Sequence, residues 1–226
     1  MIRFIKTLDV KSPKRANAHD AGVDFFIPEF SRDFVDDFVY KNLERTFVIT
    51  CVMSNGESTV SYSLSVSPDD DFNDISIYDI LVHGCLNEVE LNYGMLTDDE
   101  LNAWTVTSCV IDIAAHNRVL IPSGIKTWIE PKDSALVATN KSGVATKKGL
   151  VVGATTIDAD YTGVIHLSVI NTNDHSISIV CGEKLVQFLH LPVILSEMVE
   201  IGKDEYNKIT SNSDRGDGGF GSTGTK

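Results

Sequence analysis

The chain is short of basic residues. Among its 226 residues, 19 Lys and Arg stand against 32 Asp and Glu, which gives a formal net charge of -13 at pH 7. Nucleic-acid backbones and anionic membranes attract basic surfaces, so this balance argues against nonspecific binding to either of them. A small anionic ligand needs only a few local cations and backbone N–H groups, and this class of ligand stays open.

Membrane and metal-binding patterns are also missing. No apolar run approaches the length of a membrane span, and the first ten residues are charged and lack the apolar core of a signal peptide. The four cysteines form no C-x-x-C pair, and the six histidines show no H-x-x-x-H or H-E-x-x-H spacing, so a protein-ligated zinc ion is not indicated. We expect a soluble cytoplasmic protein with reduced thiols.

The composition is otherwise that of a globular protein, with 42% hydrophobic and 23% charged residues. Short alternating segments separated by Gly and Pro predict an all-β barrel or jelly roll. The expected strands are 2–8, 46–53, 58–66, 119–122, 125–129, 136–139, 164–170, 176–180 and 185–191. Asn55 and Gly56 predict the positive φ angles of a tight hairpin turn.

Helix signals are few. Thr97 to Glu100 fits a capping box that opens a short helix through Trp104. Residues 75–82 are compatible with a strand or a helical turn, because eight residues are too few for periodicity to decide.

The chain divides by character into three parts. Residues 31–107 are acidic, and we interpret them as an inserted α+β subdomain. Residues 1–30 and 108–210 then form the β-barrel core. Residues 211–226 contain five glycines and are expected to form a flexible C-terminal arm.

The segment 156–163, Thr-Ile-Asp-Ala-Asp-Tyr-Thr-Gly, is the first candidate for chemistry. In a strand that enters a turn, Asp158 and Asp160 point to one side and the residue between them to the other. A carboxylate held beside a bound ligand can orient and deprotonate a water molecule. Asp and Gly are also ordinary turn formers, so this stretch alone is open to both interpretations.

The second candidate is the run of Lys141, Ser142 and Gly143. Lys141 offers a cation, Ser142 a hydroxyl donor and Gly143 a close approach of the backbone, which are the features that phosphate binding uses. Lys147 and Lys148 follow, so three scarce cations lie within eight residues. The Walker pattern is absent, and a solvated basic turn is the alternative.

The C-terminal segment 215–224 is the third candidate. Arg215, Ser222 and Thr223 can surround a polyphosphate, and Phe220 lies among glycines where its ring can stack on a flat base. A flexible tail without such a role is the alternative.

Two further segments have weaker signals. Gly182 fits a turn before an apolar strand that contains Gln187, and a satisfied core glutamine is the alternative. Gly22 permits unusual φ angles before Asp24, and a structural turn is the alternative there.

Taken in order, segments 21–24, 141–143, 157–163, 182–187 and 215–224 resemble the five signature motifs of the trimeric dUTPases (deoxyuridine triphosphatases). The resemblance covers residues 1–30 and 108–226. It implies a jelly-roll-like β-barrel and a homotrimer with active sites at the subunit interfaces. It also implies Mg²⁺-dependent hydrolysis of dUTP to dUMP and pyrophosphate, which keeps uracil out of DNA and supplies dUMP for dTMP synthesis.

The resemblance also assigns roles. Asp158 would hold the water that attacks the α-phosphorus, Tyr161 would pack under the deoxyribose, and Asp24 would support the site without touching substrate. The other substrate contacts implied are Lys141, Ser142, Gly143, Ala154, Thr155 and Gln187, and, from a neighbouring subunit, Arg215, Phe220, Gly221, Ser222 and Thr223. Among these, Ala154 and Thr155 would contact uracil and Phe220 would stack on it. The triphosphate and waters would hold Mg²⁺ without a direct protein ligand.

The chain departs from the family pattern in two ways. Lys141 stands where the family usually has Arg, and Lys lacks the guanidinium fork. Some 70 or more residues after the first motif have no counterpart, and they could cover the site or bind a protein partner. Such an insertion is compatible with a viral enzyme, which would act in the host cytoplasm.

Two alternatives remain open. The first is a dCTP deaminase-like enzyme, which shares the barrel and trimer but needs an acid/base Glu that we do not find. The second is a nucleotide-binding regulatory protein that acts through residues 31–107. Ammonia release from dCTP would indicate the first, and loss of a signalling role on deletion of about residues 35–105 would indicate the second.

Overall fold

The computed structural model describes residues 1–70, 75–214 and 216. The chain forms two compact units, Met1–Val193 and Ile194–Lys226, and each is considered by itself. In the second unit the described secondary structure is the helix α5 (Lys203–Thr210). None of the described helices is both long and apolar enough to cross a membrane.

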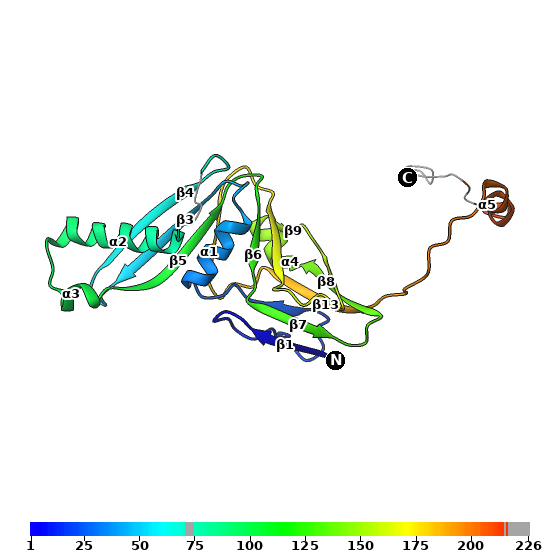
Figure 1. Ribbon diagram of the computed structural model, residues 1–226, viewed down its shortest axis with the longest axis horizontal. Coiled ribbons are helices and arrows are strands. Elements are labelled where there is room, and N and C mark those ends of the chain that lie inside the picture. The colour runs from blue at the N-terminus through cyan, green and yellow to red at the C-terminus, as the bar shows by residue number, and fades with distance from the viewer. Residues whose placement is uncertain (71–74, 215, 217–226) are drawn as a thin grey trace. The chain divides into compact units, whose positions relative to one another are not determined.

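The first unit is built mainly from short antiparallel strands (Figure 1). The strands are β1 (Ile2–Lys6), β2 (Val23–Phe25), β3 (Phe47–Ser54), β4 (Thr59–Val66), β5 (Thr105–Ile113), β6 (Arg118–Pro122), β7 (Ile125–Ile129), β8 (Ser134–Asn140), β9 (Leu150–Val152), β10 (Thr156–Asp158), β11 (His166–Asn171), β12 (Ile177–Val180) and β13 (Val186–Pro192). The helices are α1 (Arg32–Lys41), α2 (Ile77–Tyr93), α3 (Asp98–Asn102) and α4 (Ser142–Lys148).

The strands form antiparallel sheets of order β1-β7, β10-β8-β13-β2, β6-β11-β9 and β12-β5-β3-β4. Their inward-facing residues, among them Ile121, Ile125, Leu167 and Phe188, are almost completely buried in one hydrophobic core. The predicted all-β, jelly-roll-like fold class is confirmed, because most of the first unit consists of strands in antiparallel sheets.

Residues 31–107 contain α1, β3, β4, α2 and α3. The hairpin β3–β4 continues the sheet through β5, and α2 lies along this hairpin (Figure 1). The expected boundary near residue 108 falls inside β5, whose later residues pair with β12 of the barrel region. The division into a core and an inserted subdomain stays a prediction.

The local expectations differ from the structure at three places. Residues 75–82 fall largely within α2, which is much longer than the eight residues considered. In the hairpin turn Gly56 alone of the expected pair has a positive φ of 93°, while the Asn55 side chain accepts hydrogen bonds from the N–H groups of Glu57 and Ser58. The capping box of Thr97 and Glu100 is confirmed, although α3 ends at Asn102.

Candidate active site

The predicted general base lies at an exposed edge of the sheet β10-β8-β13-β2. Asp158 is the last residue of β10, where it pairs with Ala135 of β8. Its side chain and that of Asp160 are exposed, while Ala159 between them is buried. This alternation places both carboxylates in solvent, where a water molecule can reach them.

Tyr161 is held in a hydrogen-bonded turn directly after Asp158. Its N–H donates to the carbonyl of Asp158 at 3.1 Å, and its hydroxyl donates to the carbonyl of Val164 at 2.9 Å. A Cβ atom at Gly163 would collide with the tyrosine hydroxyl, so glycine allows the loop to pass this closely. The ring is 42% exposed and can contact a ligand on its open face.

Ala154 and Thr155 precede β10 and are exposed. The carbonyl of Thr155 accepts a hydrogen bond from the N–H of Ala138 at 2.6 Å, which holds this segment against β8. The structure therefore brings Ala154, Thr155, Asp158 and Tyr161 together along one edge.

A second group gathers around the buried carboxylate of Asp24 in β2. Its Oδ1 is bonded to Nζ of Lys141, and its Oδ2 lies 3.1 Å from Nζ of Lys184. Burial raises the pKa of Asp24, but hydrogen bonds from Lys141 and Lys184 outweigh this effect and leave the pKa below its ordinary value. The Asp24 carboxylate thus contacts two ammonium groups, and Asp20 brings a second carboxylate to the lining of the adjoining cavity.

Gln187 lies beside this cluster, because β13 runs between β2 and β8 and pairs Gln187 with both Asp24 and Thr139. Its Nε2 donates to the carbonyl of Asn140 at 3.1 Å. A Cβ atom at Gly22 would collide with the Gln187 side chain, so the first loop approaches closely here. A cavity of about 470 Å³ opens between these residues, lined in part by Gly22, Asp24, Asn140, Lys141 and Gln187.

Ser142 and Gly143 follow at the start of α4, and both are exposed. The first N–H groups of a helix have no partner within it, so they are available to an anion. The predicted phosphate-binding residues Lys141, Ser142, Gly143 and Gln187 therefore lie together, with Lys141 held by Asp24.

The two groups lie apart within one chain. Asp158 is on the edge strand β10 and opposite the start of β8, whereas Asp24 is on the other edge strand, β2, and Lys141 follows the end of β8. Three inter-strand spacings of roughly 4.8 Å separate the two edges. The structure does not bring Asp158 and Lys141 into one site within this chain.

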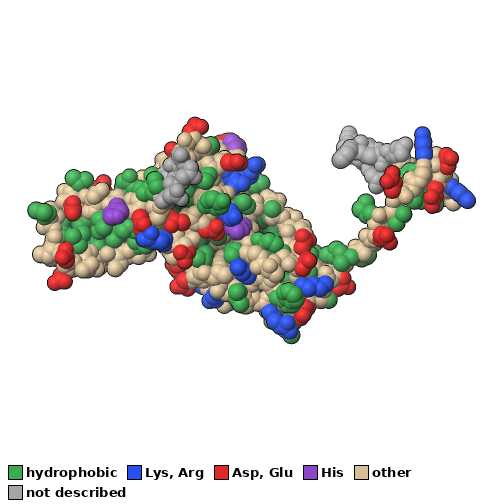
Figure 2. Space-filling model, viewed as in Figure 1, with side chains coloured by type: hydrophobic (Ala, Val, Ile, Leu, Met, Phe, Trp, Pro, Cys, Tyr) green, Lys and Arg blue, Asp and Glu red, His purple; other side chains and the backbone are tan. Residues whose placement is uncertain are grey.

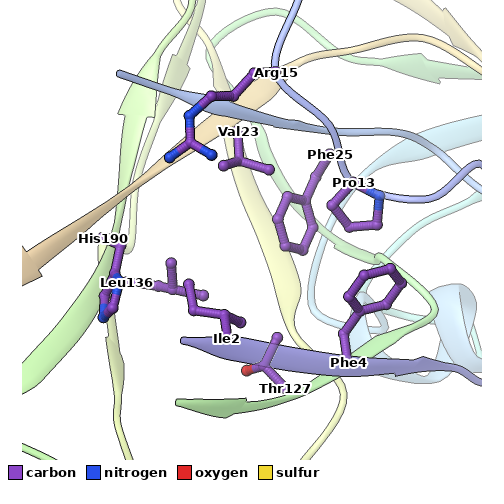
Figure 3. Close-up of a pocket in the computed structure, with 9 residues that line it drawn as sticks. All are labelled: Ile2, Phe4, Pro13, Arg15, Val23, Phe25, Thr127, Leu136 and His190. Carbon is purple, nitrogen blue, oxygen red and sulfur yellow. The ribbon is translucent and has the colours of Figure 1, made fainter. Parts of the chain in front are cut away.

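A separate, mostly apolar cavity of about 300 Å³ lies between β1, β2, β7 and β8 (Figure 3). Arg15 and His190 are its charged and titratable lining residues, and Phe4, Phe25 and Leu136 are among the apolar ones. None of the predicted site residues lines this cavity.

On the one face of the first unit that Figure 2 shows, charge is distributed rather than gathered in one patch. On the face shown in Figure 2, Asp and Glu side chains are spread over this unit with Lys and Arg between them. Within residues 1–70, 75–214 and 216, no group of three or more His, Cys, Asp or Glu side chains is arranged to hold a metal ion.

Lys184 is a residue of the phosphate-side cluster that the sequence analysis did not select. The sequence does place Lys184 in the fourth motif, three residues before Gln187. Its contact with Asp24 could not be predicted, because this contact depends on the pairing of β2 with β13. The arm residues Arg215, Phe220, Gly221, Ser222 and Thr223 lie outside the described residues.

Comparisons with known proteins identify the family of the chain. Residues 106–224 match the dUTPase family. A deoxyuridine 5'-triphosphate nucleotidohydrolase from Shewanella baltica (strain OS155 / ATCC BAA-1091) is 36% identical over 118 residues, which cover 51% of this chain and 74% of that protein. The corresponding protein of Hydrogenobaculum sp. (strain Y04AAS1) is 40% identical over 119 residues, which cover 52% of this chain and 78% of that protein. The chain belongs to the dUTPase family.

Solved structures show the same fold over almost the whole chain. The dUTPase of Staphylococcus bacteriophage 80alpha with dUpNHpp is 17% identical, with a TM-score of 0.55 over 99% of this chain and 98% of that chain. A mutant of the same phage dUTPase, also with dUpNHpp, gives a TM-score of 0.57 at 16% identity, with the same coverage. At this level of identity the likeness shows the fold alone.

Proposed function

We propose that this protein hydrolyses dUTP to dUMP and pyrophosphate with Mg²⁺, and that Asp158 activates the attacking water. The observation that carries the proposal is the turn 158–164, which fixes an exposed carboxylate and an exposed tyrosine ring next to each other. An exposed carboxylate can accept a proton from a water molecule that attacks the α-phosphorus, and phosphoryl chemistry of this kind depends mainly on positioning and charge neutralisation.

The same turn supports selectivity for a deoxynucleotide. A ring that packs under C2′ of the sugar excludes a 2′-hydroxyl by contact, and the two hydrogen bonds of Tyr161 hold its ring in one orientation. The exposed backbone at Ala154 and Thr155 is available to the uracil edge.

The phosphates are proposed to bind at the start of α4, beside the cluster of Asp24, Lys141 and Lys184. The ammonium groups of Lys141 and Lys184 and the N–H groups of Ser142 and Gly143 suit an anion there. Mg²⁺ prefers phosphate oxygens and water, so the ion would arrive with the nucleotide and neutralise its charge, while exposed Asp158 and Asp160 can accept hydrogen bonds from its waters.

The separation of the two groups supports a homotrimer with shared sites. The α-phosphorus and the terminal phosphate of one nucleotide are joined through only two phosphoanhydride bridges, a shorter span than the width of the sheet between Asp158 and Asp24. A site assembled from Asp158 of one chain and Lys141 of another meets this requirement, and cyclic association closes such a contact.

The test is pyrophosphate release from dUTP, dTTP, dCTP and UTP, measured side by side with Mg²⁺. We expect rapid release from dUTP alone. The Asp158→Asn variant is expected to bind the α,β-imido analogue of dUTP normally while its kcat falls by about 10²–10⁴-fold, the usual contribution of a general base.

Asp99→Asn is the matched control, because Asp99 is an exposed carboxylate in α3 and its loss leaves the turn 158–164 unchanged. Near-normal turnover by Asp158→Asn would contradict its assignment as the base. Release from several nucleotides, or from none, would contradict the proposed substrate, and ammonia release from dCTP would favour a deaminase.

A further inference from the structure

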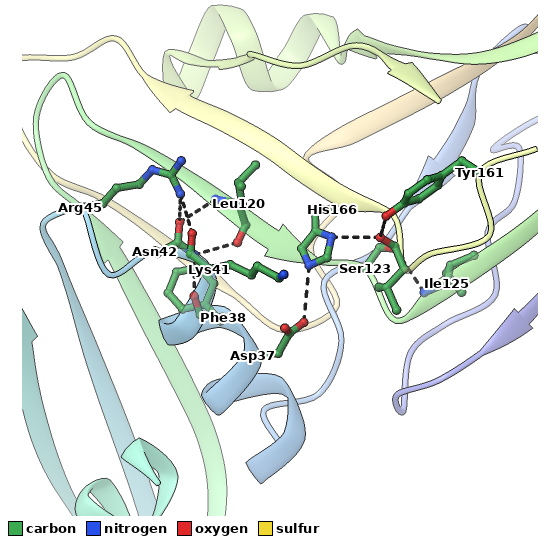
Figure 4. Close-up of polar contacts among 11 residues, drawn as sticks. Asp37, Phe38, Lys41, Asn42, Arg45, Leu120, Ser123, Ile125, Tyr161 and His166 are labelled. Atoms are coloured by element: carbon green, nitrogen blue, oxygen red, sulfur yellow. Dashed lines mark hydrogen bonds and ion pairs between the residues drawn. The ribbon is translucent and has the colours of Figure 1, made fainter. Parts of the chain in front are cut away.

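His166 lies next to the Tyr161 turn, and the proposed mechanism gives it no role. It is the first residue of β11, and its side chain is mostly buried. Its Nδ1 lies 3.0 Å from the carbonyl oxygen of Val164, the same oxygen that accepts the Tyr161 hydroxyl (Figure 4).

One carbonyl oxygen therefore joins the two side chains. A carbonyl has two lone pairs and can accept both hydrogen bonds. Because a carbonyl cannot donate, the Nδ1 atom of His166 must carry the proton in this contact. A shift of the imidazole would move the Val164 carbonyl and, with it, the acceptor that fixes the Tyr161 ring.

The other ring nitrogen faces the helix α1. Nε2 of His166 is closed off from solvent and has no hydrogen bond among the described residues. The carboxylate of Asp37 lies beyond it, with Oδ2 at 3.5 Å from Nε2 (Figure 4). The imidazole thus lies between a carbonyl of the turn and a carboxylate of α1, and the carboxylate attracts it when Nε2 also carries a proton.

Asp37 can fix the position of the His166 imidazole because its own helix, α1, is attached to the barrel strand β6. Asn42 at the C-terminal end of α1 is completely buried, its Nδ2 donates to the Leu120 carbonyl at 2.8 Å, and its Oδ1 accepts from the Leu120 N–H at 2.8 Å. Phe34 and Phe38 of α1 are also completely buried. β6, which carries Leu120, pairs with β11, which carries His166, so α1 and the histidine share one framework.

The neighbouring residue, Asp36, contacts a different element. Its carboxylate accepts from the Ser76 hydroxyl at 2.9 Å and from the N–H of Tyr78 at 3.2 Å, at the start of α2. Two consecutive carboxylates of α1 thus contact α2 and the histidine beside the active-site turn.

We propose that His166 is a positioning residue for Tyr161, and that Asp37 holds its imidazole in place. The proposal rests on the proposed function, in which the Tyr161 ring packs under the deoxyribose. The proposal gives residues 31–107 a part in sugar selectivity, because Asp37 belongs to this segment. Only the side chain of His166 lies between Asp37 and the turn that holds Tyr161.

The test compares His166→Ala with His166→Asn. The amide of Asn can donate to the Val164 carbonyl from near the position of Nδ1, whereas Ala cannot. We expect His166→Ala to raise KM for dUTP about tenfold with a smaller change in kcat, and to lower the ratio of kcat/KM for dUTP over UTP. His166→Asn should restore most of both values.

Asp37→Ala should give a smaller change in the same direction, a rise in KM of about threefold. Asp174→Ala is its matched control, because Asp174 forms the other His–Asp contact, with exposed His116 at 2.8 Å, and should leave KM and the dUTP/UTP ratio unchanged. Thermal unfolding of each variant shows which of them are folded.

Failure of the wild-type protein to hydrolyse dUTP would overturn the proposed function. Active wild-type protein together with a folded His166→Ala variant of normal KM and normal dUTP/UTP ratio would overturn the positioning role alone. Where His166→Ala does not fold, Asp37→Ala decides, and an unchanged KM and ratio in that variant would overturn the proposal.

Discussion

Asp24 is 3% exposed, and its carboxylate is compensated by two lysines that directly follow β8 and precede β13. A buried charge is costly unless it is paired, so Asp24 fixes the position of Lys141 and Lys184 as much as they stabilise it. The phosphate-side cations are therefore held in place before any ligand binds. This arrangement offers a reason why Lys141 can replace the Arg that is usual in the family, because Asp24 already orients the single charge of the Lys141 side chain.

Asp24→Asn should lower the free energy of unfolding near pH 7 by roughly 1–3 kcal/mol, because Lys141 and Lys184 lose a charged acceptor. The pKa of Asp24 is lower in the folded protein than its ordinary value of 3.8, so the ionised form stabilises the fold. This stabilisation is complete above the ordinary value and is lost as the pH falls through the folded-state pKa.

The measurement is urea unfolding of wild type and Asp24→Asn at several pH values from about 7 down to about 3. We expect the two unfolding free energies to converge as the pH falls. A difference that stays constant over this range would show that the ion pairs are not its source.

Residues of the candidate site differ in how well the sequence indicates them. Asp158 and Tyr161 lie in one short motif, and the turn that joins them is local, so their proximity could be predicted. His166 and Asp37 are far apart in the sequence, and their contact depends on the packing of α1 against β6. No spacing rule carries that information.

At the scale of elements, strands were predictable because alternation is a local signal. The helix α2 buries Ile77, Leu81, Cys85 and Val89, a four-residue repeat that becomes visible only over more than three turns. The helix α1 is not among the predicted elements, although Ser31 caps it and its apolar residues recur in pairs, because the acidic residues between them obscure the pattern. The sequence of α4 indicates phosphate-binding residues more clearly than it indicates a helix.

Asn42→Ala tests how firmly α1 is attached. The substitution leaves both backbone groups of the partly buried Leu120 without their side-chain partner, so we expect a loss of about 1–3 kcal/mol in the free energy of unfolding. Asn92→Ala is the matched control, because the Asn92 amide is exposed on α2 and bonds only to the Glu88 carbonyl of its own helix.

Urea unfolding of both variants provides the comparison, and the control should change by less than about 0.5 kcal/mol. Equal effects of the two substitutions would show that the Asn42 contacts add nothing beyond a change in helix propensity. A large and specific effect would support the rigid attachment of α1 on which the role of Asp37 depends.

At the scale of the whole molecule, the residues proposed for one reaction come from several different parts of the chain. Asp158 and the Asp24 cluster lie on opposite edges of a sheet, and the arm belongs to a second compact unit. Exposed apolar residues follow β13, including Ile194, Leu195 and Met198 at 92%, 73% and 97% exposure.

Complementation between two inactive variants tests this sharing. One variant is Asp158→Asn, and the other ends after Asp214 and so lacks the arm. Each should be nearly inactive alone, because one lacks the base and the other lacks the residues proposed to close over the phosphates. In mixed trimers, some sites combine the intact Asp158 of the truncated chain with the intact arm of the other.

Co-expression of the two variants with different tags, followed by purification on both tags, provides the mixed trimers. When each site is shared between neighbours around a ring, every mixed trimer holds one complete site, so the purified sample should regain about one third of the wild-type activity. The control is the same two proteins purified separately and mixed without subunit exchange, which should stay inactive. Mixed trimers without activity would mean that Asp158 and the arm act within one chain. In that case each site is built from a single chain, and every chain lacks either Asp158 or the arm.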